Sequence, residues 1–296
     1  MPLKPVPELL HSALTNGYAL GYFESWNLES LQGVIDAAES TRSPVIIGFN
    51  GEFLTHSGRL AKEKLNWYGA LGKTAAESAN VPCGLIFNEC PSDVHTRQAV
   101  LAGFNLVMLA DPEADFEDYL QRVSSLVEYA HAHEVAVEAE IGELPSGAEG
   151  EIDSIHASIT DPQQAAQFVA STGIDLLSVS VGNVHVLVDG ERELDLEQLE
   201  KIHYSVDLPL GLHGGSGIST SSLQGAIQLG VTKVAYGTYL KQRYLKAVRD
   251  AVNTVEINPH KLLGMGGRED VLLAGRFAVR DAILERIEAL GCCGRA

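Results

Sequence analysis

Cysteine, cationic residues and long apolar runs are all scarce in this sequence. The four cysteines, Cys83, Cys90, Cys292 and Cys293, show no CxxC or Cys/His spacing, which argues against a disulfide framework or a zinc ribbon. No apolar run reaches the ~18 residues of a membrane span, and the N-terminus lacks a signal-peptide apolar core. Lys and Arg number 21 against 39 Asp and Glu, so phosphate-rich surfaces would be repelled. These absences predict a soluble, cytoplasmic globular protein that binds neither nucleic acid nor membrane.

What recurs along the 296 residues is a short apolar run, a polar turn and an amphipathic segment. Most of the apolar runs lack strict alternation, as expected for parallel strands that are buried on both faces. The eight runs are Ala19–Phe23, Pro44–Phe49, Cys83–Phe87, Leu106–Leu109, Ala136–Ile141, Leu176–Val181, Leu208–Leu212 and Lys233–Tyr236.

The segments between these runs carry helix signals. Asp161 and Pro162 form a helix start, and Gly103 and Gly173 follow helical segments just before the next strand. Eight such units predict a single (β/α)8 barrel domain over residues 1–296, with a doubly wound sheet as the alternative. Helical segments at Pro7–Thr15 and Arg268–Leu290 are additions, and the second is long enough to form an interface in a homo-oligomer.

The active site of a (β/α)8 barrel lies at the C-terminal ends of its strands. Polar and ionisable residues collect at or just after the ends of the predicted strands, which points to an enzyme. They are Glu24, Asn50, Asn88, Glu89, Cys90, Asp111, Glu140, Asn183, His185, His213, Gly237 and Thr238.

His185 and His213 end adjacent strands, so their imidazoles can converge. Two histidines and one carboxylate, here Glu89 or Glu140, form a set of three zinc ligands that leaves one coordination position open for substrate. The alternative is that both histidines hydrogen-bond to neighbouring loops. Cys90 lies nearby, and we expect it to be a small buried filler rather than a reactive thiol.

Two loops at this rim suggest further roles. The glycines and serine of Gly214, Gly215 and Ser216 can form an anion-binding nest, or simply a tight turn. The long segment Gly142–Thr160 carries several carboxylates, and it can act as a lid that delivers a catalytic base or be only a solvated surface loop.

The chain resembles the class II, metal-dependent ketose-bisphosphate aldolases, typified by fructose-1,6-bisphosphate aldolase, over nearly its whole length. The most specific matching motifs are a GNxH sequence at residues 182–185 and an HGGSG sequence at residues 213–217, each closing a strand. Other matches are Asn27–Glu39, Val137–Gly142 and Thr160–Pro162. The resemblance implies the barrel fold and reversible aldol cleavage of a phosphorylated ketose to dihydroxyacetone phosphate and an aldehyde.

The resemblance also implies zinc, or another divalent metal, as the cofactor that polarises the ketone. By position, His185 and His213 match zinc ligands, and Glu140 matches a carboxylate near the metal. Gly214, Gly215, Ser216 and Thr238 match phosphate-binding positions, and we expect Asn50 to contact substrate. Glu149 or Glu151 matches the glutamate that transfers the proton.

Strand 3 departs from the family pattern. Where these aldolases usually read His-Leu-Asp-His-Gly, this chain reads Ile-Phe-Asn-Glu-Cys over residues 86–90. Glu89 thus occupies the position of the family's third zinc-binding histidine, and Asn88 occupies the position of its catalytic aspartate. A glutamate can bind zinc, whereas an asparagine can orient an oxygen but cannot shuttle a proton.

The leading hypothesis is therefore an aldolase-like lyase acting on a phosphorylated sugar or ketose. The alternatives are a sugar-phosphate isomerase or epimerase on the same barrel, and a catalytically silent sugar-phosphate-binding protein.

Overall fold

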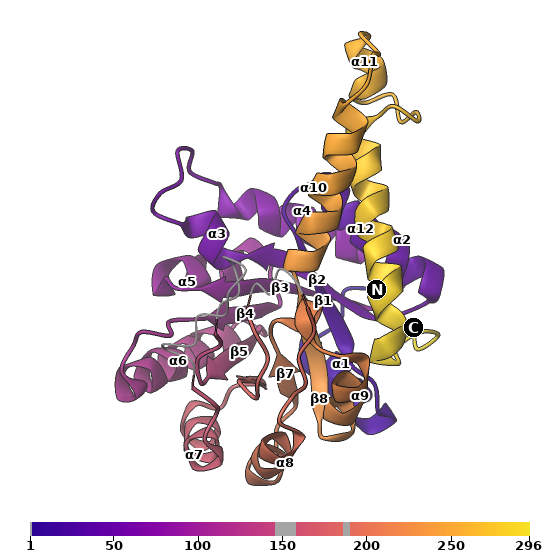
Figure 1. Ribbon diagram of the computed structural model, residues 1–296. Coiled ribbons are helices and arrows are strands. Elements are labelled where there is room, and N and C mark those ends of the chain that lie inside the picture. Colours follow the sequence, from indigo (N-terminus) through magenta and orange to yellow (C-terminus); the bar gives the residue numbers. More distant parts are fainter. Residues whose placement is uncertain (1, 146–157, 186–189) are drawn as a thin grey trace.

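The computed structural model describes residues 2–145, 158–185 and 190–296, and these form a closed barrel of eight parallel strands in sequential order (Figure 1). The barrel prediction is confirmed, and the doubly wound alternative is wrong because β1 pairs with both β2 and β8. The strands are β1 Leu20–Ser25, β2 Val45–Asn50, β3 Cys83–Cys90, β4 Leu106–Leu109, β5 Ala136–Ile141, β6 Leu176–Val179, β7 Leu210–Leu212 and β8 Val231–Tyr236.

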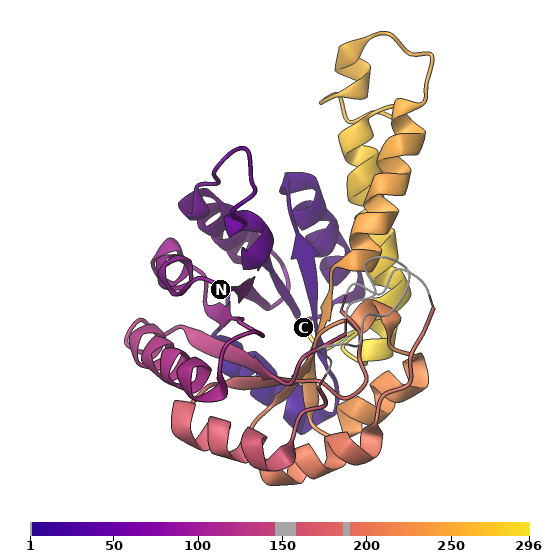
Figure 2. The ribbon, with the colours of Figure 1, turned by 60° about the vertical axis from the view of Figure 1, so that its left-hand side comes forward.

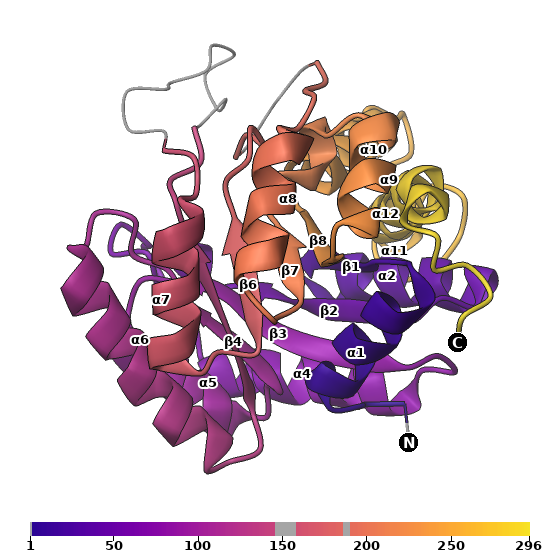
Figure 3. The ribbon, with the colours of Figure 1, turned by 90° about the horizontal axis from the view of Figure 1, so that it is seen from below.

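Helices cover the outside of the barrel, so most strand residues are buried on both faces, as the continuous apolar runs predict (Figure 3). Those between strands are α2 Leu28–Thr41, α3 Gly51–Thr55, α4 Leu65–Ser78, α5 Asp93–Ala102, α6 Phe116–His131, α7 Pro162–Thr172, α8 Leu196–Ser205, η1 Gly215–Gly217 and α9 Thr220–Gln228. Gly103 and Gly173 cap α5 and α7 in the left-handed conformation, as predicted. No helix in the described part of the chain is long and apolar enough to cross a membrane.

The two ends of the barrel differ. Helix α1 (Val6–Asn16) lies at the N-terminal ends of the strands, where Lys4 N donates a hydrogen bond to Cys83 O and Val6 packs close to Gly84. This leaves the opposite rim, where the strands end, to form the site.

A helical arm projects from the barrel (Figures 1 and 2). It consists of α10 (Thr238–Val252), α11 (Pro259–Leu262) and α12 (Val271–Ile287), followed by the short helix η2 (Glu288–Leu290). The predicted helix at Arg268–Leu290 thus begins three residues later, where Asp270 caps it. Gly33 allows α2 to approach α12 closely, and Arg276 binds Asp36 through two hydrogen bonds of 2.6 and 2.7 Å. These contacts fix α12 to α2 on the outside of the barrel.

Candidate active site

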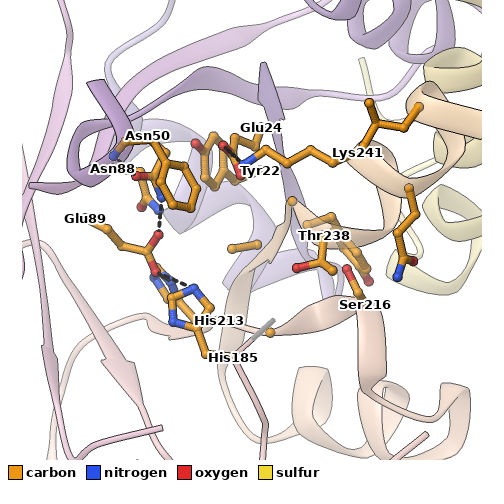
Figure 4. A pocket seen from close by; sticks show the side chains of 17 residues that line it. Tyr22, Glu24, Asn50, Asn88, Glu89, His185, His213, Ser216, Thr238 and Lys241 are labelled. Atoms are coloured by element: carbon orange, nitrogen blue, oxygen red, sulfur yellow. Dashed lines mark hydrogen bonds and ion pairs between the residues drawn. The ribbon is translucent and has the colours of Figure 1, made fainter. Parts of the chain in front are cut away.

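A cavity of about 350 Å³ lies at the C-terminal rim and brings together most of the predicted site residues (Figure 4). Strands β1, β2, β3 and β8, the loops after β6 and β7, and helices α3 and α10 contribute to its wall. The predicted residues that line it are Glu24, Asn50, Asn88, Glu89, His185, His213, Gly214, Ser216, Gly237 and Thr238.

Glu89 reaches this cavity because β3 is irregular at that point. Side chains of a regular strand alternate between faces, so Asn88 and Glu89 would point to opposite sides. The register with β4 shifts between Phe87 and Cys90, and Glu89 has a φ of 50°, in the left-handed region. The bulge turns both polar side chains toward the cavity, at a backbone cost of about 1–3 kcal/mol.

The Glu89 carboxylate connects the two histidines. Its Oε1 lies 2.7 Å from His213 Nδ1 and 3.6 Å from His185 Nε2. Its Oε2 accepts a 2.6 Å hydrogen bond from Asn50 Nδ2, while Asn50 Oδ1 accepts the backbone N–H of Phe53 at the start of α3. Asn50, predicted to contact substrate, therefore also holds Glu89 in place.

A buried charged network supports His213 from inside the barrel. His213 Nε2 lies 3.0 Å from Glu138 Oε1, and Glu138 binds Lys233 Nζ at 2.6 and 2.7 Å. Ser178 Oγ donates a further 2.7 Å hydrogen bond to Glu138. Sequence reasoning missed Glu138 and Lys233, although a charged residue within an otherwise apolar buried strand signals a paired interior charge.

Two carboxylates and two cationic side chains balance one another in this buried network. Burial disfavours ionisation of Glu138, but the Lys233 ammonium and His213 outweigh that effect and hold its pKa at about 2. Burial likewise opposes the charged form of His213, yet the Glu89 carboxylate and its neighbours raise the His213 pKa to about 10. Burial also opposes the Glu89 carboxylate, and His185 and His213 lower its pKa well below the ordinary value. In the metal-free protein His213 is thus an imidazolium between two carboxylates.

The donor atoms around Glu89 fit a divalent metal. The described residues hold no ready-made cluster of three His, Cys, Asp or Glu metal ligands, and Glu89 and His213 are in direct hydrogen-bond contact. Ligand atoms about 2.0–2.2 Å from a tetrahedral zinc lie about 3.3 Å apart, so small side-chain shifts and loss of the Nδ1 proton of His213 would suffice. His213 Nε2 would keep its hydrogen bond to Glu138, which is the usual carboxylate support of a metal-binding histidine.

The opposite end of the cavity suits an anion. Gly214, Ser216 and Thr238 line it, and Ser216 Oγ accepts the backbone N–H of Tyr239 in the first turn of α10. Gly214 has a φ of 68°, and a Cβ there would come within 2.2 Å of Val184 O. Gly215 is not part of the cavity lining, because it packs against β8.

Sequence reasoning also missed two lining residues, Lys241 and Tyr22. Lys241 follows Thr238 by one helical turn, and its Nζ donates a 2.6 Å hydrogen bond to Glu24. That helical spacing is the signal that could have identified it. Tyr22 lies on β1 two residues before Glu24, and its buried hydroxyl has no hydrogen-bond partner among the described residues.

Glu140 and Asp111 line a second, neighbouring cavity of about 930 Å³ rather than the first. Glu140 Oε1 is shielded from solvent without a described hydrogen-bond partner. Burial raises the pKa of Glu140 to about 7, against the attraction of His213. The structure therefore places Glu140 beside the histidine pair but not in contact with it.

Replacing Glu140 with glutamine is expected to stabilise the metal-free protein above pH 7. Below its ordinary pKa of 4.5 the carboxyl is protonated in both the folded and unfolded states; between 4.5 and about 7 only the unfolded state ionises, which destabilises the fold. Removing that penalty contributes about 3 kcal/mol at pH 8 and little at pH 4. Urea unfolding at the two pH values measures the difference, and equal effects at both would contradict it.

Four further residues that the sequence placed at the strand ends or in the following loop are not among the described residues that line the first cavity. Glu149 and Glu151 lie outside the described residues. Cys90 is buried, and burial raises its pKa, which fits the predicted filler. Asn183 is also buried, and it donates hydrogen bonds to the backbone oxygens of Val179 and His213, so it braces the two strand ends instead of lining the cavity.

Comparisons with known proteins identify the family of this chain. The family described as "Fructose-bisphosphate aldolase class-II" matches residues 4–295. A fructose-bisphosphate aldolase of Geobacillus stearothermophilus is 33% identical over 298 residues, covering 100% of this chain and 99% of the relative. One from Staphylococcus aureus is 32% identical over 301 residues, with 100% of both chains covered.

Solved structures show the same relationship. The YdjI aldolase of Escherichia coli K12 aligns with a TM-score of 0.81 and 31% identity over 99% of both chains. A putative fructose-1,6-bisphosphate aldolase of Coccidioides immitis aligns with a TM-score of 0.79 and 26% identity, covering 98% of this chain and 97% of the other. The chain therefore belongs to the class II fructose-bisphosphate aldolase family and is a class II aldolase-like lyase.

Proposed function

We propose that the protein catalyses reversible aldol cleavage of a phosphorylated ketose into dihydroxyacetone phosphate and an aldehyde. The observation that carries this proposal is that one cavity holds two imidazoles joined by a carboxylate at one end and a Gly-Ser-Thr anion site at the other. Family membership favours this lyase over the isomerase and the silent binding protein.

In this proposal His185, His213 and Glu89 hold a divalent metal, with zinc the expected ion. When bound, the metal acts as a Lewis acid that polarises the ketone and stabilises the enediolate. The chain's own contribution is orientation: Asn50 fixes Glu89, and Glu138 fixes His213. Such supporting contacts typically change metal affinity or activity by about 10–100-fold.

Asn88 has the chemistry to orient the aldehyde oxygen. Its side chain is buried in the cavity wall, and its Oδ1 has no described hydrogen-bond partner. An amide can donate to an oxygen that gains charge, but it cannot carry the proton. We assign proton transfer to Glu149 or Glu151, on the basis of the family resemblance of the segment Gly142–Thr160.

The test is a cleavage assay of the zinc-loaded protein with a panel of ketose phosphates. Release of both dihydroxyacetone phosphate and an aldehyde is expected, and Asn88→Ala is expected to lower kcat by about a hundredfold with a smaller change in KM. Isomers without fragments would instead indicate an isomerase, and bound but unchanged substrate would indicate a silent binding protein.

We also propose that the α10–α12 arm joins copies of the chain in a homo-oligomer. Apolar side chains are exposed near its tip: Val252, Val255, Ile257, Leu263 and Met265. A sedimentation mass equal to one chain would contradict this.

A further inference from the structure

The second cavity, of about 930 Å³, continues the first one past the candidate metal ligands. Glu89 and His185 line both cavities, so they stand at the junction between them. Aldol cleavage breaks the bond between the α and β carbons of the ketone that a metal at this junction would polarise, so the two halves of the substrate would extend to opposite sides of the junction. If the phosphate lies at Ser216 and Thr238, the aldehyde half extends into the second cavity.

The wall of the second cavity is acidic. Six carboxylates line it, and no Lys or Arg is among its lining residues in the described part of the chain. The carboxylates are Glu52, Glu89, Asp111, Glu113, Glu140 and Glu143. The segments 146–157 and 186–189, which the structure does not describe, contain neither Lys nor Arg in the sequence. They therefore bring no cationic side chain of this type to the aldehyde half.

Three arginines lie within three residues of this wall in sequence, and the guanidinium group of each already has partners. Arg97, two residues after the lining His95, donates hydrogen bonds to Ser125 O and Oγ and lies over the Tyr129 ring. Arg122 lies 2.6 Å from Asp111, 2.8 Å from Asp93 and 3.6 Å from Asp118, so one guanidinium faces three negative charges. Arg59, three residues after the lining His56, binds Glu63. None of these three arginines is among the lining residues of the second cavity.

The end of the first cavity that lies away from Glu89 and His185 carries groups that can bind a phosphate. Gly214, Ser216 and Thr238 line it with hydroxyl and backbone groups. Lys241 lines it as well, although its ammonium is paired with Glu24, whereas no Lys or Arg is among the described lining residues of the second cavity. The first turn of α10, whose Tyr239 N–H meets Ser216, adds the partial positive charge of a helix N-terminus. Groups that bind phosphate are thus found on one side of the candidate metal ligands and not on the other.

We propose that the substrate is a ketose monophosphate whose single phosphate occupies the first cavity, and whose aldehyde half is an uncharged polyol in the second. This inference rests on the proposed function. The reason is electrostatic. Glu89 is paired with His213 and Asp111 with Arg122, but Glu52, Glu113 and Glu143 have no ion pair among the described residues. A second phosphate would meet these carboxylates without a lining Lys or Arg from the same chain, and like charges placed together select against a ligand. The relatives described above are named for a bisphosphate, so the inference predicts a difference in substrate within the family.

Equilibrium binding of two unreactive analogues tests the inference. Hexitol 1-phosphate and hexitol 1,6-bisphosphate are reduced forms of the two substrate classes, and calorimetry with the zinc-loaded protein measures their dissociation constants. We expect the monophosphate to bind about tenfold more tightly at low salt, with the difference shrinking as salt screens the carboxylates. Tighter binding of the bisphosphate would overturn the inference alone, whereas failure of both to bind at millimolar concentration would overturn it together with the proposed function.

Two matched charge reversals test whether the preference for the monophosphate comes from the wall of the second cavity. Glu113→Lys places a cation in the wall of the second cavity, and it is expected to shift the affinity ratio several-fold toward the bisphosphate. Glu128→Lys makes the same charge change on α6 at a position that lines neither cavity, and the ratio should stay unchanged. Equal shifts in both variants would contradict a role for this wall.

Discussion

Replacing His213 with alanine is expected to lower aldol cleavage by at least about a thousandfold. The imidazole offers Nδ1 to the candidate metal position beside Glu89, and its Nε2 side is fixed by Glu138. Its loss removes one metal ligand and leaves two buried carboxylates facing an empty space. The measurement is kcat/KM of the zinc-supplemented variant, in the assay that detects both cleavage products.

The control is a histidine outside the site. His11 is exposed on α1, at the opposite end of the barrel, and His11→Ala should leave kcat/KM unchanged. Circular dichroism and the urea midpoint establish whether the His213 variant remains folded. A folded His213→Ala protein with undiminished cleavage would contradict the assignment of the site.

Replacing Lys233 with methionine is expected to destabilise the protein by about 3–5 kcal/mol, because it breaks a buried ion pair by removing one partner. Lys233 and Glu138 are fully buried, and both carboxylate oxygens of Glu138 accept from the ammonium. Without Lys233, the remaining partners of Glu138 are His213 and Ser178. Urea unfolding near neutral pH measures the change.

Two variants make this prediction specific. Lys233→Met combined with Glu138→Leu should be more stable than Lys233→Met alone, because it removes the unpaired carboxylate. Its activity should be about 10–100-fold below that of the wild type, because His213 loses the support of Glu138. Lys201→Met breaks an exposed pair with Glu197, 2.8 Å apart, and should change stability little. A loss of stability no larger for Lys233→Met than for Lys201→Met would contradict the argument.

The barrel was predictable because its strands are short, apolar and buried on both faces. Runs such as Leu106–Leu109 and Ala136–Ile141 are identical to β4 and β5. The rim was predictable for the same reason: once the strand ends are known, the residues that follow them share one face of the barrel. His185, His213, Asn88 and Thr238 were found in this way.

The connections between rim residues were not predictable from the same pattern. Strand alternation would place Glu89 and Asn88 on opposite faces, and only the bulge brings both to the cavity. Of the two glutamates on β5, the pattern drew attention to Glu140, at the end of the strand, whereas Glu138 contacts His213. Hydrogen-bond partners from distant strands depend on the register of the closed barrel, which local sequence does not encode.

Neither motifs nor periodicity reveal that acidic residues from separate loops gather in the wall of the second cavity. Acidic residues are common throughout the chain, and their meaning appears only when Glu52, Asp111 and Glu143, from three different connections, line one cavity. Charge composition predicts only that nucleic acid is not a partner, whereas the distribution of charge between the two cavities is what leads us to propose a monophosphate substrate.

The most direct test of the account is the metal content of protein purified without chelator and without a metal-affinity tag, compared with His185→Ala prepared in the same way. His185 lies 3.6 Å from Glu89 and lines both cavities, so its removal leaves the proposed site with two ligands. The account predicts about one zinc or equivalent divalent ion per wild-type chain and a large loss in the variant. No metal in either protein, or equal metal in both, would contradict the proposed centre at His185, His213 and Glu89.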